Sequence, residues 1–142
     1  MSIPDPRPGL VIHYSYLWSH EAATGAEEGR KDRPAALLFF IDDGDQAYVA
    51  PITHSEPTDP DAAIAIPTAV NNALGLDDDQ SWIVVSELNA FTWPGADLRA
   101  IPGSDPARYA YGFLPPKFFR IVRDHALKLA RERKAQSVKR TD

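Results

Sequence analysis

One stretch of the chain concentrates positive charge beside a proline. Residues 30–34 read Arg-Lys-Asp-Arg-Pro, at the point where a polar loop leads into an apolar run. An arginine fixed at a strand start presents a planar fork of donors that suits a phosphate group. Short basic motifs more often form solvated turns, and here such a turn would contain an Asp–Arg ion pair. The phosphate site and the solvated turn both stay open as interpretations. Lys31 and Arg33 are therefore candidate ligands of a phosphate.

Two hydroxyls and an imidazole stand in three consecutive positions, Thr53, His54 and Ser55, after a predicted strand. Hydroxyls bind phosphate oxygens, and histidine transfers protons near neutral pH. The alternative is a strand cap in which Thr53 or Ser55 bonds the following backbone. The group fits phosphodiester chemistry, with His54 as the candidate acid or base.

A third group combines polar side chains with aromatic rings. Glu87 and Asn89 end a predicted strand, and Phe91 and Trp93 follow. Single-stranded RNA is commonly held by stacking on aromatic rings and by amide contacts to base edges. The aromatic residues of a small barrel are more often part of its core, so this group is a weaker candidate for substrate binding.

Metal and cofactor chemistry has little support in the sequence. The chain has no cysteine, its four histidines show no paired spacing, and residues 77–79 lack the glycine and distal glutamate of a calcium loop. No glycine-rich phosphate loop or nucleophile elbow is present either. We expect no metal site and no cofactor.

The charge distribution limits the possible partners. The 142 residues carry a formal net charge of -5, but residues 117–142 hold nine basic and three acidic side chains, so the remaining body is strongly acidic. Such a body disfavours non-specific binding of polyanions, and any nucleic acid must be held by a few local cations. No window approaches the ~20 apolar residues of a membrane helix, and the first residues do not resemble a signal peptide. We expect a cytoplasmic protein with no membrane partner.

Alternating and continuous apolar runs predict a mainly β chain. The turn 42–45 joins two of the runs into a hairpin, and Pro51 suggests that the returning strand ends at or near a sheet edge. The predicted strands are 10–18, 35–41, 46–53, 63–66 and 81–88.

A different pattern closes the chain. Phe118, Val122, Ala126 and Leu129 form a helical stripe after Pro115. We expect one domain over residues 1–142, a small barrel or sandwich with a C-terminal helix. Its core covers about 9–133, with an extended arm at 1–8 and a frayed basic tail at 134–142.

These segments in order resemble the PemK/MazF family of toxins from bacterial toxin–antitoxin systems. The matching stretches are 9–12, 25–35, 51–55 and 81–89, and the helix after Pro115 falls where the family has its closing helix. The resemblance covers most of residues 9–133. It rests on short motifs, and their common order makes it specific.

The resemblance implies an SH3-like barrel of antiparallel strands, usually a homodimer, that cleaves single-stranded RNA without a metal. Such a toxin inhibits growth unless a cognate antitoxin protein binds it. Arg33 matches the arginine that stabilises the charged phosphorane, and Thr53 matches the hydroxyl residue at the scissile phosphate. Glu27 or Glu28 falls near an acidic loop residue of some members. The expected substrate-binding residues are Lys31, Ser55, Glu87, Asn89 and Trp93.

The chain also departs from the family pattern. Its body is acidic, and extra residues at 56–61 and 89–112 could cover the RNA groove. Two alternatives therefore stay open. One is a non-catalytic barrel that acts as a binding or regulatory module. The other is a barrel that binds a small molecule or peptide in a groove of aromatic residues, namely Tyr14, Tyr16, Trp18, Trp82 and Trp93.

Overall fold

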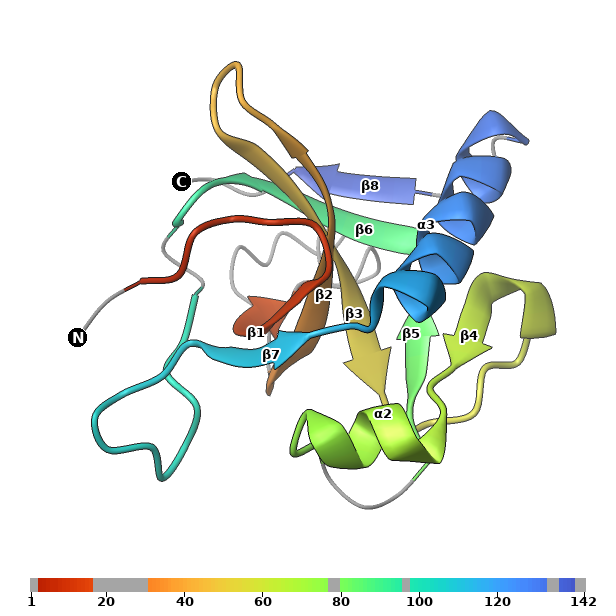
Figure 1. Ribbon diagram of the computed structural model, residues 1–142. Coiled ribbons are helices and arrows are strands. Elements are labelled where there is room, and N and C mark those ends of the chain that lie inside the picture. Colours follow the sequence, from red (N-terminus) through yellow and green to blue (C-terminus); the bar gives the residue numbers. More distant parts are fainter. Residues whose placement is uncertain (1–2, 17–30, 77–79, 96–97, 133–135, 140–142) are drawn as a thin grey trace.

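The computed structural model describes residues 3–16, 31–76, 80–95, 98–132 and 136–139. The expected fold class, mainly β with a C-terminal helix, is confirmed (Figure 1). In chain order the elements are β1 (Leu10–Tyr16), β2 (Lys31–Ile41), β3 (Gln46–Thr53), η1 (Pro60–Ala62), β4 (Ala63–Ala65), α2 (Thr68–Ala73), β5 (Trp82–Val84), β6 (Glu87–Thr92), β7 (Ala110–Phe113), α3 (Pro116–Arg131) and β8 (Gln136–Lys139).

The strands form one bent sheet in the order β4-β5-β3-β2-β1-β7, with β6 beside β3 and β8 beside β6. All pairs are antiparallel except β6 with β8, which is parallel. Within the described residues no pairing joins the edge strands β4, β7 and β8 to one another, so the barrel-like sheet is not closed.

Strand β3 is central, which corrects the expectation that it ends at a sheet edge. Its first half pairs with β6 up to Val49, and its end pairs with β5 from Ile52. Pro51 lies in the interval between these two ladders. A proline there removes no hydrogen bond from either of them, because neither β6 nor β5 pairs with that position.

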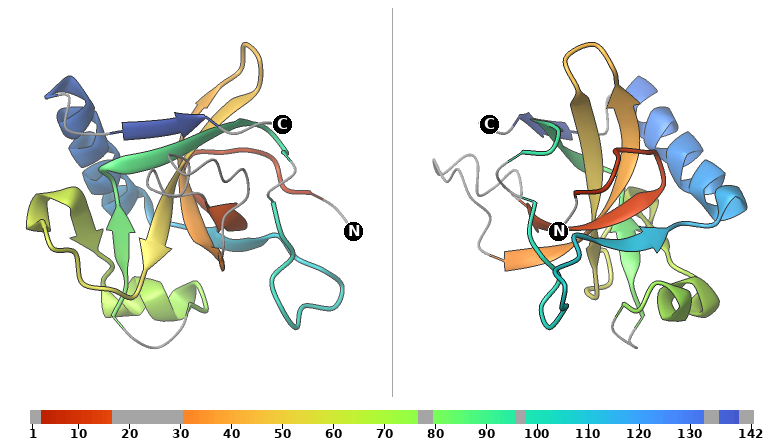
Figure 2. Two further views of the ribbon diagram at one scale, coloured as in Figure 1. Left: turned by 180° about the vertical axis from the view of Figure 1, so that it is seen from behind. Right: turned by 60° about the vertical axis from the view of Figure 1, so that its left-hand side comes forward.

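Side chains along β1, β2 and β3 point alternately to the two faces of the sheet, and this divides the core into two clusters. The larger cluster contains Val11, Ala36 and Ala50, and Phe118 and Val122 of α3 pack against it. Helix α3 therefore covers one face of the sheet (Figure 2). The second cluster lies on the opposite face of these strands, around Leu10, Ile12, Tyr14, Leu37, Val49 and Phe91.

Three segments differ from the sequence prediction. The single strand expected at 81–88 is broken between β5 and β6, because the N–H groups of Val85 and Ser86 both bond the carbonyl of Ala62. Residues 110–113, which overlap the end of the insertion expected at 89–112, form β7 and pair with β1. The tail expected to fray contains β8, whose backbone pairs with β6. Such long-range pairings leave no local signature in the sequence.

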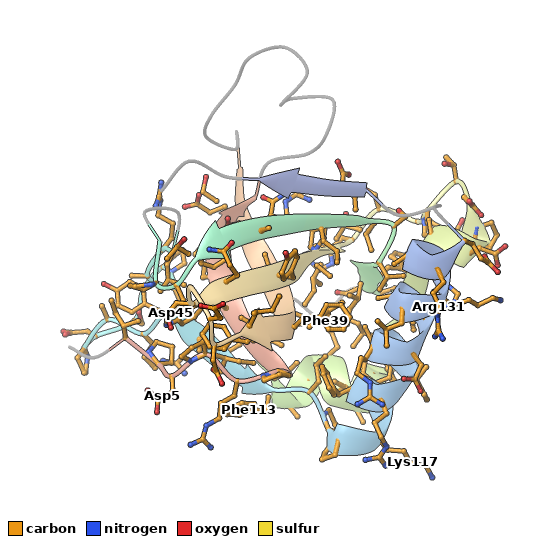
Figure 3. All side chains as sticks on the ribbon, turned by 90° about the horizontal axis from the view of Figure 1, so that it is seen from above. Asp5, Phe39, Asp45, Phe113, Lys117 and Arg131 are labelled. Atoms are coloured by element: carbon orange, nitrogen blue, oxygen red, sulfur yellow. The ribbon has the colours of Figure 1, made fainter. Side chains whose placement is uncertain are left out.

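The basic residues of α3 lie away from these core contacts. Lys117 and Arg131 are exposed and stand near opposite ends of the helix (Figure 3). Among the described residues, no helix is long and apolar enough to cross a membrane.

Candidate active site

A cleft of about 510 Å³ lies where β2 begins and β3 ends. Residues two apart on a strand share a face, so the face that carries Val11, Ala36 and Ala50 in the core continues toward these strand ends. Beyond the core, that face presents mostly polar side chains to the cleft: His13, Asp32, Pro34, Ile52 and His54. Leu76, Ser81, Ile101 and Tyr111 contribute further lining. The cleft is thus the polar continuation of the helix-covered face of the sheet.

Two of the three groups singled out in the sequence meet in this cleft. Arg33 comes from the start of β2, and Thr53, His54 and Ser55 come from the end of β3. The β2–β3 hairpin explains the meeting. Its register pairs Ala35 with Pro51, and counting two residues further sets Arg33 beside Thr53. The hairpin therefore brings Arg33 and Thr53 to one end of the sheet at the cleft, at positions that alternate with those of Asp32 and His54.

Thr53 has a backbone partner as well as a place in the cleft. Its Oγ1 accepts a hydrogen bond of 3.1 Å from the N–H of Ser55. This is the strand-cap interaction considered as the alternative. A hydroxyl that accepts one bond still has a hydrogen to donate. The cap holds Thr53 Oγ1 in a defined position, from which it can donate to a phosphate oxygen.

The ring of His54 is held through one nitrogen. Its Nδ1 lies 3.3 Å from the carbonyl oxygen of Gln80 and 3.2 Å from Oγ of Ser81, which is buried. A carbonyl oxygen only accepts, so we assign the hydrogen to Nδ1 in the neutral ring. These contacts orient the exposed side chain of His54 at the cleft.

His13 was not among the predicted site residues, yet it lines the same cleft. It is 7% exposed, and its Nδ1 lies 2.8 Å from the hydroxyl oxygen of Tyr111. Burial lowers the pKa of His13 below its ordinary value of 6.5, and the carboxylate of Asp32 partly opposes this by favouring the imidazolium. His13 is therefore a neutral imidazole at pH 7. The only sequence signal was a histidine alternating with apolar residues of a strand.

The lowered pKa of His13 predicts that acidification weakens the fold. In the unfolded protein the pKa of His13 is near 6.5, and in the folded protein it is lower. At a pH between these two pKa values, the unfolded state therefore binds more protons than the folded state. The stabilising contribution is present above about pH 6.5 and is lost as the pH falls through the folded pKa. Denaturant unfolding at about pH 7.5 and about pH 5.5 measures this loss. On this change of pH, His13→Gln should lose less stability than the wild type, and His125→Gln should lose as much as the wild type. A loss in His13→Gln as large as that of the wild type contradicts the prediction.

The third predicted group is not part of the cleft. Asn89 is fully buried where β6 pairs with Val49 of β3, and Trp93 packs beside Phe91 with ring centroids 5.9 Å apart. Glu87 begins β6 and is partly exposed, but it does not line the cleft. Glu87, Asn89 and Trp93 therefore do not line this cleft, and a role for them in substrate binding stays a prediction. Phe91 lies in β6 and in the second core cluster, and Trp93 follows the strand and packs against that cluster.

The structure adds little about the other residues that the sequence singled out. Lys31 begins β2 next to Asp32, but its side chain, like Glu27 and Glu28, lies outside the described part of the chain. The aromatic groove considered for a small molecule is also weakened, because Tyr14 is completely buried in the second core cluster.

Among the described residues, no group of three or more histidine, aspartate or glutamate side chains is placed to hold a metal ion. No model of a known protein family matches the chain, and a search of curated proteins finds no match either. The assignment of a function therefore depends on the chemistry of the cleft.

Proposed function

We propose that the protein is a metal-independent endoribonuclease of the PemK/MazF type, which cleaves single-stranded RNA. One observation carries the proposal. Arg33 of β2 and the neighbouring residues Thr53 and His54 at the end of β3 line one cleft. A guanidinium, a hydroxyl and an imidazole are the groups that a phosphodiester cleavage requires for charge stabilisation, positioning and proton transfer.

The proposed reaction uses the ribose 2′-hydroxyl as the nucleophile. Its oxygen attacks the adjacent phosphorus while a base removes its proton, and the bond from phosphorus to the 5′ oxygen breaks. His54 protonates that leaving oxygen from Nε2. Arg33 offsets the negative charge that builds on the phosphoryl oxygens, and Thr53 donates a hydrogen bond to one of them. The products are a 2′,3′-cyclic phosphate and a 5′-hydroxyl end.

The charge pattern predicts how RNA is bound. Asp32 lies in the cleft beside Arg33, and the protein carries a net charge of -5. Few phosphates can be neutralised at once, so RNA affinity should be modest and its dependence on salt shallow. Ser55, which also lines the cleft, is the remaining predicted substrate ligand there.

The proposal is tested with a DNA oligonucleotide that contains one ribonucleotide, between a fluorophore and a quencher, in the presence of EDTA. We expect cleavage 3′ to the ribonucleotide of an accepted sequence, and none of the all-DNA control, because the nucleophile is the 2′-hydroxyl. A panel that varies the flanking bases covers sequence preference. If no RNA in the panel or in total cellular RNA is cleaved, and induced expression leaves growth unchanged, the ribonuclease proposal fails and the non-catalytic binding module is favoured.

The toxin interpretation also includes partners: we propose a homodimer in the cytoplasm whose activity an antitoxin protein suppresses. A second groove of about 640 Å³, distant in the fold from the catalytic strand ends, supports a protein interface. It is mostly apolar and is formed by the hairpin and α3, including Phe40, Ile41, Phe119 and Leu127. Sedimentation at micromolar concentration should show a dimer; a ~16 kDa monomer would contradict this part of the proposal.

A further inference from the structure

Tyr111 reaches His13 through an irregularity in the pairing of β1 with β7. The register shifts between Val11 and Ile12, which leaves Tyr111 as the extra residue on β7. A bulge of this kind turns a side chain out of the regular alternation, and bulges are frequent beside active sites. Here it accompanies the 2.8 Å hydrogen bond between the Tyr111 hydroxyl and Nδ1 of His13, which are 98 residues apart in the chain. The bulge and the hydrogen bond thus place a buried imidazole at the cleft.

We propose that His13 is the general base of the cleavage reaction and that Tyr111 is its positioning residue, an assignment that rests on the proposed ribonuclease function. The assignment uses the tautomer in which His13 Nδ1 donates its hydrogen to the Tyr111 oxygen. Nε2 is then the basic nitrogen, and it takes the proton of the 2′-hydroxyl. The hydrogen bond to Tyr111 holds the direction of the ring, as the contacts with Gln80 and Ser81 do for His54.

The surroundings of His13 suit a base better than an acid. A general base must be unprotonated at the start of the reaction, and burial keeps His13 neutral at pH 7. Asp32, across the β1–β2 pair, then stabilises the imidazolium that forms when the proton arrives. The same carboxylate therefore limits the loss of basicity caused by burial.

The two histidines divide the proton transfers between them. His13 Nε2 gains the proton of the 2′-hydroxyl, and His54 Nε2 gives a proton to the 5′ oxygen as the P–O5′ bond breaks. The number of protons on the protein is unchanged after cleavage. Exchange with water then restores the starting state.

Other charged and titratable groups belong to the elements around His13. The backbone carbonyl of His13 accepts a hydrogen bond from the N–H of Arg99, and the backbone N–H of His13 donates one to the carbonyl of Tyr109. The ionisable side chains on the strands and loops that pack against His13 are Asp32, Arg33, His54, Arg99, Tyr109 and Tyr111. Of these, Asp32 is the group whose charge shifts the pKa of His13.

The assignment is tested by measuring kcat/KM for the fluorogenic RNA substrate from about pH 5 to about pH 9, where histidines titrate. His13→Gln should lower kcat/KM by about 10²-fold to 10⁴-fold, the usual contribution of a general base, and should remove the acidic limb of the profile. Asp32→Asn should move the acidic limb to lower pH, because it removes the charge that raises the pKa of His13. Tyr111→Phe should lower kcat and alter the same limb, while His125→Gln on α3 should match the wild type.

The outcomes separate this assignment from the proposed function. If the wild type cleaves RNA and a folded His13→Gln keeps its rate and its acidic limb, His13 is not the base and the ribonuclease proposal stands. If the wild type cleaves no RNA, both proposals fail. Because His13 is buried and its replacement could prevent folding, the exposed Asp32 provides the second test: an acidic limb that stays in place in Asp32→Asn also overturns the assignment.

Discussion

Replacing Arg33 by alanine should lower the rate of RNA cleavage by about 10²-fold to 10³-fold, the loss measured when one pre-organised donor to a developing charge is removed. This corresponds to about 2.7–4 kcal/mol of transition-state stabilisation. Arg33 is the third residue of β2, between Asp32 and Pro34, and it lines the cleft before substrate arrives. A donor that is already in place costs little reorganisation during the reaction. The loss should therefore appear mainly in kcat.

Two further variants identify what the Arg33 side chain supplies. Arg33→Lys keeps the positive charge but removes the planar fork, and it should restore only part of the lost rate. Arg120→Ala removes an exposed arginine from α3, outside the cleft, and should leave kcat unchanged. Circular dichroism on the same preparations checks the fold. A folded Arg33→Ala protein with the wild-type rate would remove Arg33 from the site.

Replacing His54 by glutamine should slow cleavage by about 10²-fold to 10⁴-fold, the range for loss of a general acid. The acid must be protonated to act, so the wild-type rate should fall on the alkaline side of the pH–rate profile, and this limb should be absent in the variant. The contacts of Nδ1 with Gln80 and Ser81 point to Nε2 as the donor. An activated leaving group at the 5′ oxygen, which needs no proton, should restore much of the lost rate.

Thr53→Val is the matched comparison for His54→Gln, because the two residues are neighbours at the end of β3. It removes the hydroxyl that we propose donates to the phosphate and transfers no proton, so cleavage should slow without any change in the shape of the pH profile. Ser55 also loses the acceptor of its N–H bond in this variant, and unfolding experiments report that cost separately. If His54→Gln and the wild type give overlapping profiles, the acid lies elsewhere.

Local patterns were sufficient to predict the elements that position Arg33 and Thr53. The run of apolar residues before the turn at 42–45 and the alternating return predict the hairpin, and the hairpin register sets the two residues near each other. Pro115 and the stripe beginning at Phe118 predict α3 because a helix start and a 3.6-residue period are both local signals. The sequence therefore pointed to Arg33, Thr53 and His54, which line one cleft, and their catalytic roles stay a prediction.

Tertiary structure alone decided which other residues join them. His13 could have been a polar residue on an exposed strand face; it becomes part of the cleft because β7 pairs with β1 and a bulge turns Tyr111 toward it. Asn89 could have contacted RNA, but the pairing of β6 with β3 buries it completely. Pairing between distant strands depends on how the whole chain buries its apolar faces, and the alternation within one strand reports only that two faces differ. The sequence by itself thus determined the β2–β3 hairpin, α3 and the choice of Arg33, Thr53 and His54 as candidates, whereas the packing of the sheet decided which polar side chains reach the cleft and which are enclosed in the core.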